Sequence, residues 1–165
     1  MKIIETRIEG LLIFEPDVYQ DNRGDFFESY NDSVYKDFGF KEVFVQENQS
    51  YSVQNVIRGL HYQVGKNAQG KLARVAFGKY FSIELSQMNK LQFWIPPGFA
   101  HGLSVLSKEA VFIYKCTKPF SKTDERSIRF NDPDLQIDWE IFDPIVSDKD
   151  EQAPSFQEAI NELIT

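Results

Sequence analysis

The sequence has few of the residues from which disulfides, metal sites and nucleic-acid interfaces are made. Cys116 is its single cysteine, so the chain can form no internal disulfide and no cysteine-based metal site. His61 and His101 are its two histidines, and their spacing matches no local pattern of metal ligands, so we expect no metal. The net charge of −7 argues against a nucleic-acid partner. A small anionic ligand stays open wherever a few cations converge.

Long apolar runs are also missing. The first residues, MKIIETRIEGLLIFEP, place acidic side chains within and beside a short apolar run. We therefore expect neither a signal peptide nor a membrane span, and we expect the protein in the cytoplasm. A length of 165 residues predicts a single domain over residues 1–165, large enough to bury most of its apolar surface.

Aromatic residues are abundant, at 15% of the chain, and they favour β-structure around an aromatic-lined interior. The chain reads as short apolar segments separated by turn residues. We expect strands at Leu11–Glu15, Phe26–Tyr30, Val43–Gln49, Val56–Gln63, Lys71–Ala76, Tyr80–Leu85, Leu91–Ile95, Gly102–Leu106 and Ala110–Thr117. Asn31 to Ser33 can cap a short helix that ends at Gly39, and the apolar spacing from Phe156 to Leu163 predicts a terminal amphipathic helix. The pattern indicates an all-β sandwich or barrel with helices at its margins.

The stretch Val56-Ile-Arg-Gly-Leu-His-Tyr-Gln63 places a guanidinium and an imidazole on one expected strand. Arg58 and His61 are three residues apart, so a regular strand would direct them to opposite faces. A bulge at Gly59 could bring both to one side. Such inward polar groups are costly unless the interior is a polar pocket. On these residues alone, an ordinary surface strand is an equal alternative.

Other polar residues have both a functional and a structural interpretation. Tyr114 shares a strand face with Phe112 and Cys116, so it points inward and could be a core tyrosine. Lys71 opens a strand after a glycine-containing loop and could be a solvated lysine. The segment Ser147-Asp-Lys-Asp150 has the composition of a surface turn.

Taken together, the motifs resemble one enzyme family in order and nearly in spacing. They are Asp21-Asn-Arg-Gly24, Phe44-Val-Gln-Glu-Asn48, Arg58-Gly-Leu-His-Tyr-Gln63, Gly70-Lys-Leu-Ala-Arg-Val75, Trp94-Ile-Pro-Pro-Gly-Phe-Ala-His-Gly102, Tyr114-Lys-Cys-Thr117 and Ser147-Asp-Lys-Asp150. The chain resembles the dTDP-4-dehydrorhamnose 3,5-epimerases of the cupin superfamily, from about Gly10 to Pro154. The resemblance implies a cupin-like jelly-roll β-barrel, a homodimer, and neither a metal nor an organic cofactor.

The resemblance also implies a substrate and catalytic roles. The substrate would be a thymidine-diphosphate 4-keto-6-deoxyhexose, whose C4 ketone acidifies the hydrogens on C3 and C5. By resemblance, His61 takes the carbon-bound proton, and Asp150 orients His61. Tyr114 returns a proton from the other side of the sugar, and Lys71 stabilises the oxyanion at C4.

Binding residues carry over in the same way. Arg23, Arg58 and Lys71 suit a diphosphate. In the family, the positions of Arg23 and Glu28 reach a nucleotide held largely by the partner subunit, and Phe26 is a candidate stacking face for thymine. The remaining candidates for contact with the sugar nucleotide are Gln46, Glu47 (in place of an aspartate), Asn48, His101, Glu125 and Lys149.

One departure from the family concerns the junction of Ala76 with Phe77. Family members have an additional strand and loop of roughly 15–20 residues between the two. Removing one strand from an antiparallel meander reverses the direction of every strand that follows. The later motifs nevertheless still match the family. Either the sequence omits a segment that the molecule has, or the protein carries a real deletion with a rebuilt sheet. We favour an omitted or artificially removed segment over a natural working variant.

Two other functions stay open on the sequence. A related sugar-nucleotide 3-epimerase or 3,4-ketoisomerase would share the barrel and the proton chemistry. A barrel that binds a sugar nucleotide without catalysis is the other alternative, and the missing strand is the feature that favours it.

Overall fold

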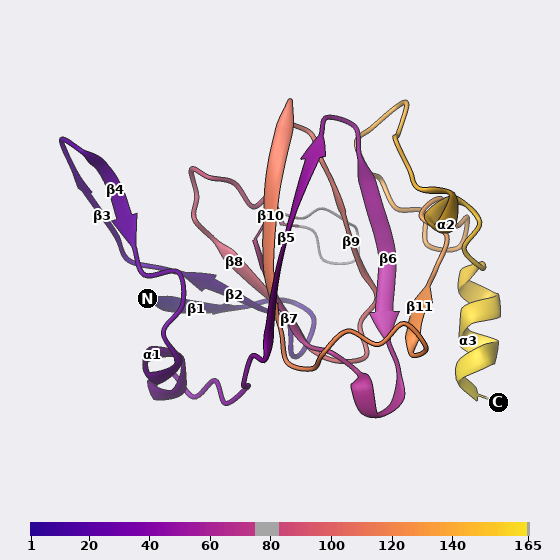
Figure 1. Cartoon of the computed structure of the whole chain (residues 1–165), viewed down its shortest axis with the longest axis horizontal. Coiled ribbons are helices and arrows are strands. Elements are labelled where there is room, and N and C mark those ends of the chain that lie inside the picture. The colour runs from indigo at the N-terminus through magenta and orange to yellow at the C-terminus, as the bar shows by residue number, and fades with distance from the viewer. Residues whose placement is uncertain (75–82, 165) are drawn as a thin grey trace.

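The computed structural model describes residues 1–74 and 83–164, and most of its elements are antiparallel strands. A six-stranded sheet has the order β1-β2-β8-β7-β10-β5, and a three-stranded sheet has the order β11-β6-β9. The strands of the first are β1 Lys2–Glu5, β2 Leu12–Glu15, β8 Gln92–Ile95, β7 Lys71–Arg74, β10 Glu109–Cys116 and β5 Gln46–Val53. Those of the second are β11 Glu125–Ser127, β6 Ile57–Gln63 and β9 His101–Ser104. Figure 1 shows β6 and β9 standing across from β5 and β10, as in a jelly-roll barrel of the cupin type.

Hydrophobic clusters cover the outer side of each sheet. Phe14, Leu72 and Trp94 of the large sheet pack with Tyr35 and Phe40 in an aromatic cluster. On the other side of the barrel, Ile57, Leu60 and Tyr62 of β6 pack with Ile128, Trp139 and Ala159. Burying such side chains stabilises the fold by about 1.5–3 kcal/mol each. Because the apolar side chains of β6 are used on its outer face, its polar side chains are left for the space between the sheets.

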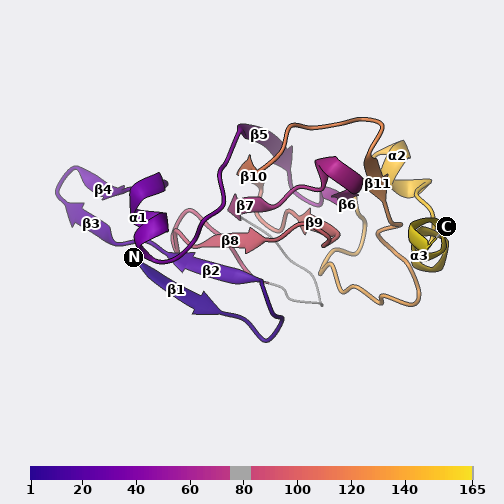
Figure 2. The same cartoon turned by 90° about the horizontal axis from the view of Figure 1, so that it is seen from below.

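Helices lie at the margins of the barrel. In α1, Asp32–Asp37, the Asn31 side chain accepts hydrogen bonds from Ser33 N and Val34 N, and Gly39 follows the helix with a φ of +84°. The helix α3, Phe156–Ile164, lies beside β6 and β11 near the C-terminus (Figures 1 and 2). Both helices were predicted from the sequence and are confirmed. No helix among the described residues is long and apolar enough to cross a membrane.

A two-stranded hairpin extends from the body of the molecule. It consists of β3, Val18–Asp21, and β4, Gly24–Phe27, joined by a two-residue turn. Figures 1 and 2 both show it at the end of the molecule farthest from α3. The predicted strand Phe26–Tyr30 is therefore placed too late, because the turn ends at Arg23 and β4 begins at Gly24, whereas the prediction extended the turn to Asp25.

Two other predicted strands need correction. The predicted strand Val43–Gln49 begins at Gln46 and continues to Val53, because residues 50–53 pair with β10 despite their polar composition. The predicted strand Gly102–Leu106 is shifted to His101–Ser104. β1, β3 and β11 were not predicted, and Gly65–Asn67 form a 3-10 turn within the predicted loop.

The region after β7 is described only in part. Ile83–Leu85, the described end of the predicted strand Tyr80–Leu85, are not in a strand. Residues 80–82, the end of the predicted strand Lys71–Ala76 and the junction of Ala76 with Phe77 lie outside the described residues. On either side of this region, β7 and β8 are antiparallel neighbours, with Lys71 opposite Ile95.

Candidate active site

An irregularity in β6 directs two polar side chains to the same side of the strand. The register between β6 and β9 shifts between Arg58 and His61, and Gly59 has a φ of +124°. A Cβ atom at Gly59 would lie 2.6 Å from the Gly102 Cα atom and 2.9 Å from the His101 carbonyl oxygen. Only glycine fits this position, which confirms the predicted bulge.

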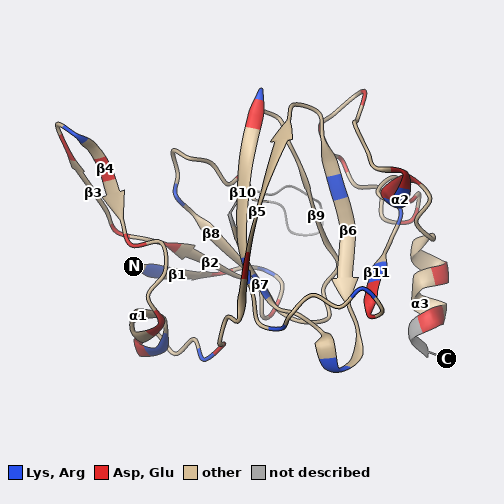
Figure 3. Ribbon diagram, viewed as in Figure 1, with Lys and Arg blue, Asp and Glu red and all other residues tan. Residues whose placement is uncertain are grey.

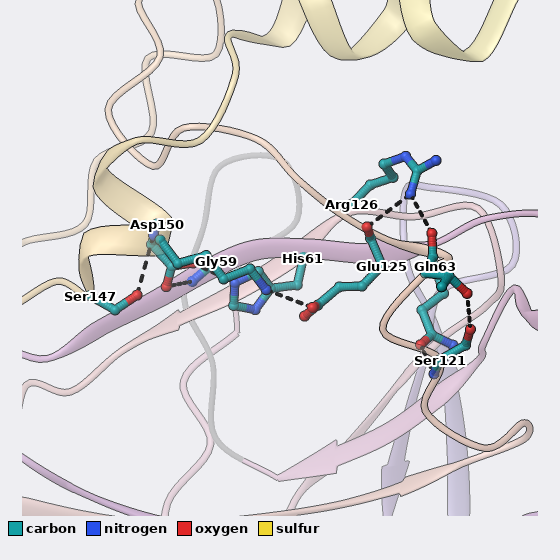
Figure 4. Close-up of polar contacts among 10 residues, drawn as sticks. Gly59, His61, Gln63, Ser121, Glu125, Arg126, Ser147 and Asp150 are labelled. Carbon is teal, nitrogen blue, oxygen red and sulfur yellow. Dashed lines mark hydrogen bonds and ion pairs between the residues drawn. The ribbon is translucent and has the colours of Figure 1, made fainter.

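His61 is held by a carboxylate from a distant part of the chain. Its Nε2 atom lies 2.6 Å from Oδ1 of Asp150, whose side chain is 5% exposed, in the short helix α2, Asp148–Glu151. The other carboxylate oxygen accepts a hydrogen bond from Gly59 N at 3.3 Å (Figure 4). A carboxylate accepts, so His61 donates from Nε2–H, and Nδ1 keeps its lone pair. This arrangement leaves Nδ1 as the basic nitrogen.

Two opposing effects set the pKa of Asp150. Burial alone would raise it, but hydrogen bonds from His61, Gly59 and Ser147, together with the charge of His61 when protonated, hold the pKa of Asp150 below its usual value. Ser147 also caps α2, since its hydroxyl accepts from Asp150 N at 3.2 Å. The segment Ser147–Asp150 has the composition of a surface turn, but the contacts with His61 and Gly59 bury Asp150.

The large sheet presents a lysine and a phenol toward the same interior. The Lys71 Nζ atom lies 2.7 Å from His101 Nε2, and His101 stands opposite His61 in the register of β9 and β6. The same Nζ atom lies 5.2 Å from the centroid of the Tyr114 ring. Lys71 thereby links β9 of the three-stranded sheet to β10, which carries Tyr114. The predicted residues His61, Lys71, His101 and Tyr114 therefore lie next to one another.

The surroundings of Tyr114 favour the protonated phenol. Burial, and then the neighbouring Cys116, raise its pKa above the usual value, although a hydrogen bond from Asn48 acts in the opposite direction. Tyr114 and Asn48 are opposite each other in the register of β10 and β5. Burial also lowers the pKa of Lys71.

Further predicted residues line the same interior. Arg58 donates to the Ser52 hydroxyl at 3.0–3.1 Å and to the Tyr51 carbonyl oxygen at 3.3 Å, which links β6 to β5. The blue segment on β6 in Figure 3 is Arg58, the one charged residue of that strand. Gln46 donates to Asn48 Oδ1 at 2.9 Å. Ser52 was not identified from the sequence, since a serine in a polar strand carries no distinctive signal.

Glu125 and Lys149 pair with each other beside His61. Lys149 Nζ lies 2.7 Å from Glu125 Oε2 and joins α2 to β11. Ser127 of β11 is opposite His61, so Glu125, two residues earlier, lies on the same face of the sheet. Lys149 directly precedes Asp150, and the ion pair therefore anchors the helix that carries the carboxylate.

Four predicted residues lie elsewhere in this chain. Arg23 and Phe26 are on the β3–β4 hairpin, where Arg23 pairs with Asp21 and Phe26 is 68% exposed. Glu28 directly follows the hairpin and accepts from Asn31 Nδ2 at 3.0 Å. Glu47 alternates with its neighbours in β5, so it points to the outer face, where it pairs with Lys115. The structure does not bring these four to His61.

Elsewhere among the described residues, the structure has a cavity but no metal cluster. A cavity of about 610 Å³ is lined by Tyr51, Val111 and Leu85 among others, and it includes neither His61 nor Tyr114. Tyr51 and Val111 are on the outer face of β5 and β10, opposite to Tyr114. In residues 1–74 and 83–164, no group of three His, Cys, Asp or Glu residues could hold a metal ion.

The fold and the comparisons below define a class of protein, a cupin-like jelly-roll enzyme. The family model for dTDP-4-dehydrorhamnose 3,5-epimerase matches the chain in two segments, residues 5–81 and 75–158. The chain belongs to this family, which is a family of isomerases.

Known relatives match nearly the whole chain. A dTDP-4-dehydrorhamnose 3,5-epimerase of Shigella flexneri is 44% identical over 177 aligned positions, covering 96% of this chain and 98% of the relative. The crystal structure of the enzyme from Elizabethkingia anophelis is 43% identical with a TM-score of 0.86, covering 96% of this chain and 97% of that one. An epimerase from Legionella pneumophila, solved with dTDP-4-keto-L-rhamnose, is 41% identical with a TM-score of 0.89, covering 98% of this chain and 96% of that one.

Proposed function

We propose that the protein epimerises C3 and C5 of a thymidine-diphosphate 4-keto-6-deoxyhexose through enolate intermediates. The observation that supports this most directly is the arrangement of His61 and Asp150 on one side of the interior and of Lys71 and Tyr114 on the other. The proton is removed by a base on one face and returned by an acid from the opposite face, and this exchange inverts a carbon centre. The bound ligand of the Legionella relative, a dTDP-4-keto sugar, supports the substrate class.

Each side chain has one task in the proposed reaction. His61 Nδ1 takes the proton from carbon, and Asp150 stabilises the imidazolium that forms. The electrons left on carbon move to the C4 oxygen, and the Lys71 ammonium stabilises the oxyanion. Tyr114 delivers a proton to the opposite face of the sugar. The exchange moves protons only, so the reaction needs no change of oxidation state.

The remaining candidate residues would bind the nucleotide part of the substrate. We propose that Arg58 contacts the diphosphate, with Gln46, Asn48, Glu125 and Lys149 nearby. Since Arg23, Phe26, Glu28 and Glu47 lie away from His61, we propose that they act on a partner subunit's site in a homodimer. The exposed aromatic side chains of the projecting hairpin support this arrangement. We also propose that the enzyme works in the cytoplasm.

Incubation with the 4-keto sugar nucleotide in deuterated water tests the proposed reaction. Deuterium at both C3 and C5 is expected. Deuterium at C3 alone would indicate a 3-epimerase, migration of the keto group would indicate a 3,4-ketoisomerase, and binding without exchange would indicate a non-catalytic barrel. His61→Asn is expected to abolish exchange at both centres. Tyr114→Phe is expected to retain part of the exchange while inversion fails, because the base remains and the acid is lost.

We propose further that residues 1–165 form one jelly-roll domain that lacks a strand present in its relatives. The 177 aligned positions exceed the 165 residues of the chain, so part of the relative has no counterpart here. The two family-model segments also meet at residues 75–81. An intact mass above 19.2 kDa for the protein from its natural source would mean that the sequence omits a segment. An intact mass of 19.2 kDa would mean a real deletion.

A further inference from the structure

We propose that Lys90 is a positioning residue, which fixes the projecting hairpin β3–β4 so that one face of it can complete the nucleotide site of a partner subunit. The proposal rests on the function proposed above, in which Phe26 and Glu28 of the hairpin region act on the partner's site. Lys90 lies in the turn that precedes β8, and none of the motifs that resemble the family includes it.

Two contacts join Lys90 to β4. Its Nζ atom lies 2.5 Å from Asp25 Oδ2 and 5.4 Å from the centroid of the Phe27 ring. The Lys90 side chain is 10% exposed and that of Asp25 is 37% exposed, so solvent screens this ion pair less than a pair on the open surface. A cation over an aromatic face adds an attraction of its own. One ammonium group therefore holds two residues of the same strand.

The alternation of side chains along β4 separates a held face from a free face. Asp25 and Phe27 are two residues apart, so both side chains point to the side of Lys90. Phe26 lies between them and points the other way, and it is 68% exposed. The contacts with Lys90 therefore fix one face of the strand and leave the face of Phe26 available to another molecule.

The turn that carries Lys90 is held by the side chain of one asparagine. Asn89 Oδ1 accepts from Ser86 N at 3.0 Å and from Leu91 N at 3.1 Å. Its Nδ2 atom donates to the Glu84 carbonyl oxygen at 2.8 Å. Lys90 N donates to the Ser86 carbonyl oxygen at 3.2 Å. Because these bonds close the turn from both sides, the Lys90 side chain starts from a fixed backbone.

A second contact holds the chain just beyond the hairpin. Gln92 of β8 is 2% exposed, and its Nε2 atom donates to the Ser29 carbonyl oxygen at 2.7 Å. Its Oε1 atom accepts from the Tyr35 hydroxyl of α1 at 2.7 Å, so both ends of the amide are bound. Asp25 and Ser29 therefore tie residues 26–28 to β8 and its turn at both ends. This range contains two of the residues proposed to serve the partner's site.

The hairpin depends on such attachments. Among the described residues, β3 and β4 form a sheet of their own, and an isolated two-stranded hairpin is at best marginally stable in water. Without Lys90 the hairpin would take several orientations, and the partner's nucleotide site would be complete only part of the time. The apparent affinity for the substrate falls by that fraction, whereas the proton-transfer residues of each chain are unaffected.

Lys90→Met tests the proposal, because methionine keeps an apolar stem and removes the charge. We expect the KM for the 4-keto sugar nucleotide to rise about tenfold, which corresponds to about 1.4 kcal/mol, with little change in kcat. Lys90→Arg is expected to stay close to the wild type, since a guanidinium can pair with Asp25 and stack on Phe27. Lys41→Met removes the same charge from an exposed lysine and is the matched control.

Asp25→Asn removes the ion pair from the other side. It is expected to raise KM less than Lys90→Met does, because the contact with Phe27 remains, and to cause no further rise in the Lys90→Met background. An unchanged KM in Lys90→Met, or a loss of kcat alone, would overturn the proposal. Equal damage by Lys90→Arg and Lys90→Met, or full additivity with Asp25→Asn, would overturn it as well. If thermal unfolding shows that Lys90→Met has failed to fold, the rise in KM of Asp25→Asn decides.

Hydrogen exchange of backbone amides in the protein without substrate separates this proposal from the proposed function. Lys90→Met is expected to speed exchange about tenfold in β3 and β4 and to leave β5 and β10 unchanged, because only the hairpin loses an attachment. Unchanged exchange in the hairpin, or faster exchange in all four strands alike, would overturn the positioning role even in an active enzyme. If the wild-type protein incorporates no deuterium into the sugar nucleotide, the proposed function fails while amide exchange still decides the attachment.

Discussion

At Asp150 a single carboxyl group is subject to two opposing forces, burial and hydrogen bonding, and the hydrogen bonds prevail. Nothing in the local sequence reveals this. Ser147-Asp-Lys-Asp150 has the composition of a surface turn, and the contact of Asp150 with His61 spans 89 residues of chain. The residue types of the site could be predicted by resemblance, whereas the burial of Asp150 depends on tertiary contacts that no local pattern encodes.

Replacement of this carboxylate tests its effect on the imidazole. In Asp150→Asn the amide can donate to Nε2, which would move the ring proton to Nδ1 and remove the base. We expect kcat to fall by on the order of 10⁴-fold, by analogy with the loss of the orienting carboxylate in a catalytic triad. Asp148→Asn, on the exposed side of the same helix, is the matched control and should retain activity. Similar activity of the two variants would contradict the orienting role.

The lowered pKa of His101 predicts how the stability of the protein depends on pH. Its pKa in the folded protein lies below 6.5, and its neighbours Lys71 of β7 and His61 of β6 add positive charge rather than remove it. As the pH falls below about 6.5, the unfolded chain takes up a proton at this residue that the folded protein does not. The free energy of unfolding therefore decreases, by at most about 1.4 kcal/mol per pH unit for one proton.

Urea unfolding of the wild type and of His101→Gln between pH 7 and pH 5 measures this contribution. Glutamine does not titrate, so the variant should lose less stability than the wild type over that range. Asp150 does not confuse the comparison, since its lowered pKa matters only as the pH falls below its ordinary value of 3.8. Parallel curves for the two proteins would show that His101 takes up its proton equally in the folded and unfolded states.

Among the elements, β6 depends most on one residue. Gly59 combines a φ of +124° with a contact to the backbone of β9, and both exclude a side chain. We expect Gly59→Ala to lower the free energy of unfolding by about 2–4 kcal/mol and to displace His61. Gly39→Ala is the control, because Gly39 has a φ of +84° but no atom within 4 Å of the place that a Cβ would take, and it should cost about 1 kcal/mol. If both variants lost the same free energy of unfolding in urea, the backbone of β9 would have to move aside from the added methyl group at little cost.

The sequence predicted apolar elements better than polar ones. β10 and α3 have apolar side chains at regular spacing, and their predicted and observed ranges nearly agree. β5 reads as a strand followed by a polar connection, yet it continues to Val53, because its polar inner face lines the site instead of a core. β11 was not predicted at all, since three residues carry no periodicity and the pairing with β6 supplies the strand.

For the whole molecule, the position of the hairpin predicts cooperation between subunits. If Arg23 serves the partner subunit's site, His61→Asn and Arg23→Ala damage different sites in a mixed dimer, and one site stays intact. Assayed well below the KM of the wild type, an equal mixture that exchanges subunits should recover about a quarter of wild-type activity, although His61→Asn is inactive alone and Arg23→Ala nearly so. Mixing His61→Asn with Asp150→Asn should recover nothing, because both residues serve the same site of their own chain. Recovery of activity in both mixtures, or in neither, would contradict the proposal that the hairpin of one chain serves the site of its partner.

The exposed pair of aromatic rings on that hairpin, Tyr19 opposite Phe26, has a consequence for any assay of this enzyme. If the hairpin completes the nucleotide site of a partner subunit, an isolated chain has all of its proposed proton-transfer residues but fewer contacts with the thymidine moiety. Turnover per milligram should therefore decline on extreme dilution through a weakening affinity for the nucleotide, while the rate at saturating substrate declines far less. A single chain would then hold the residues for catalysis, and the dimer would be needed to bind the substrate tightly.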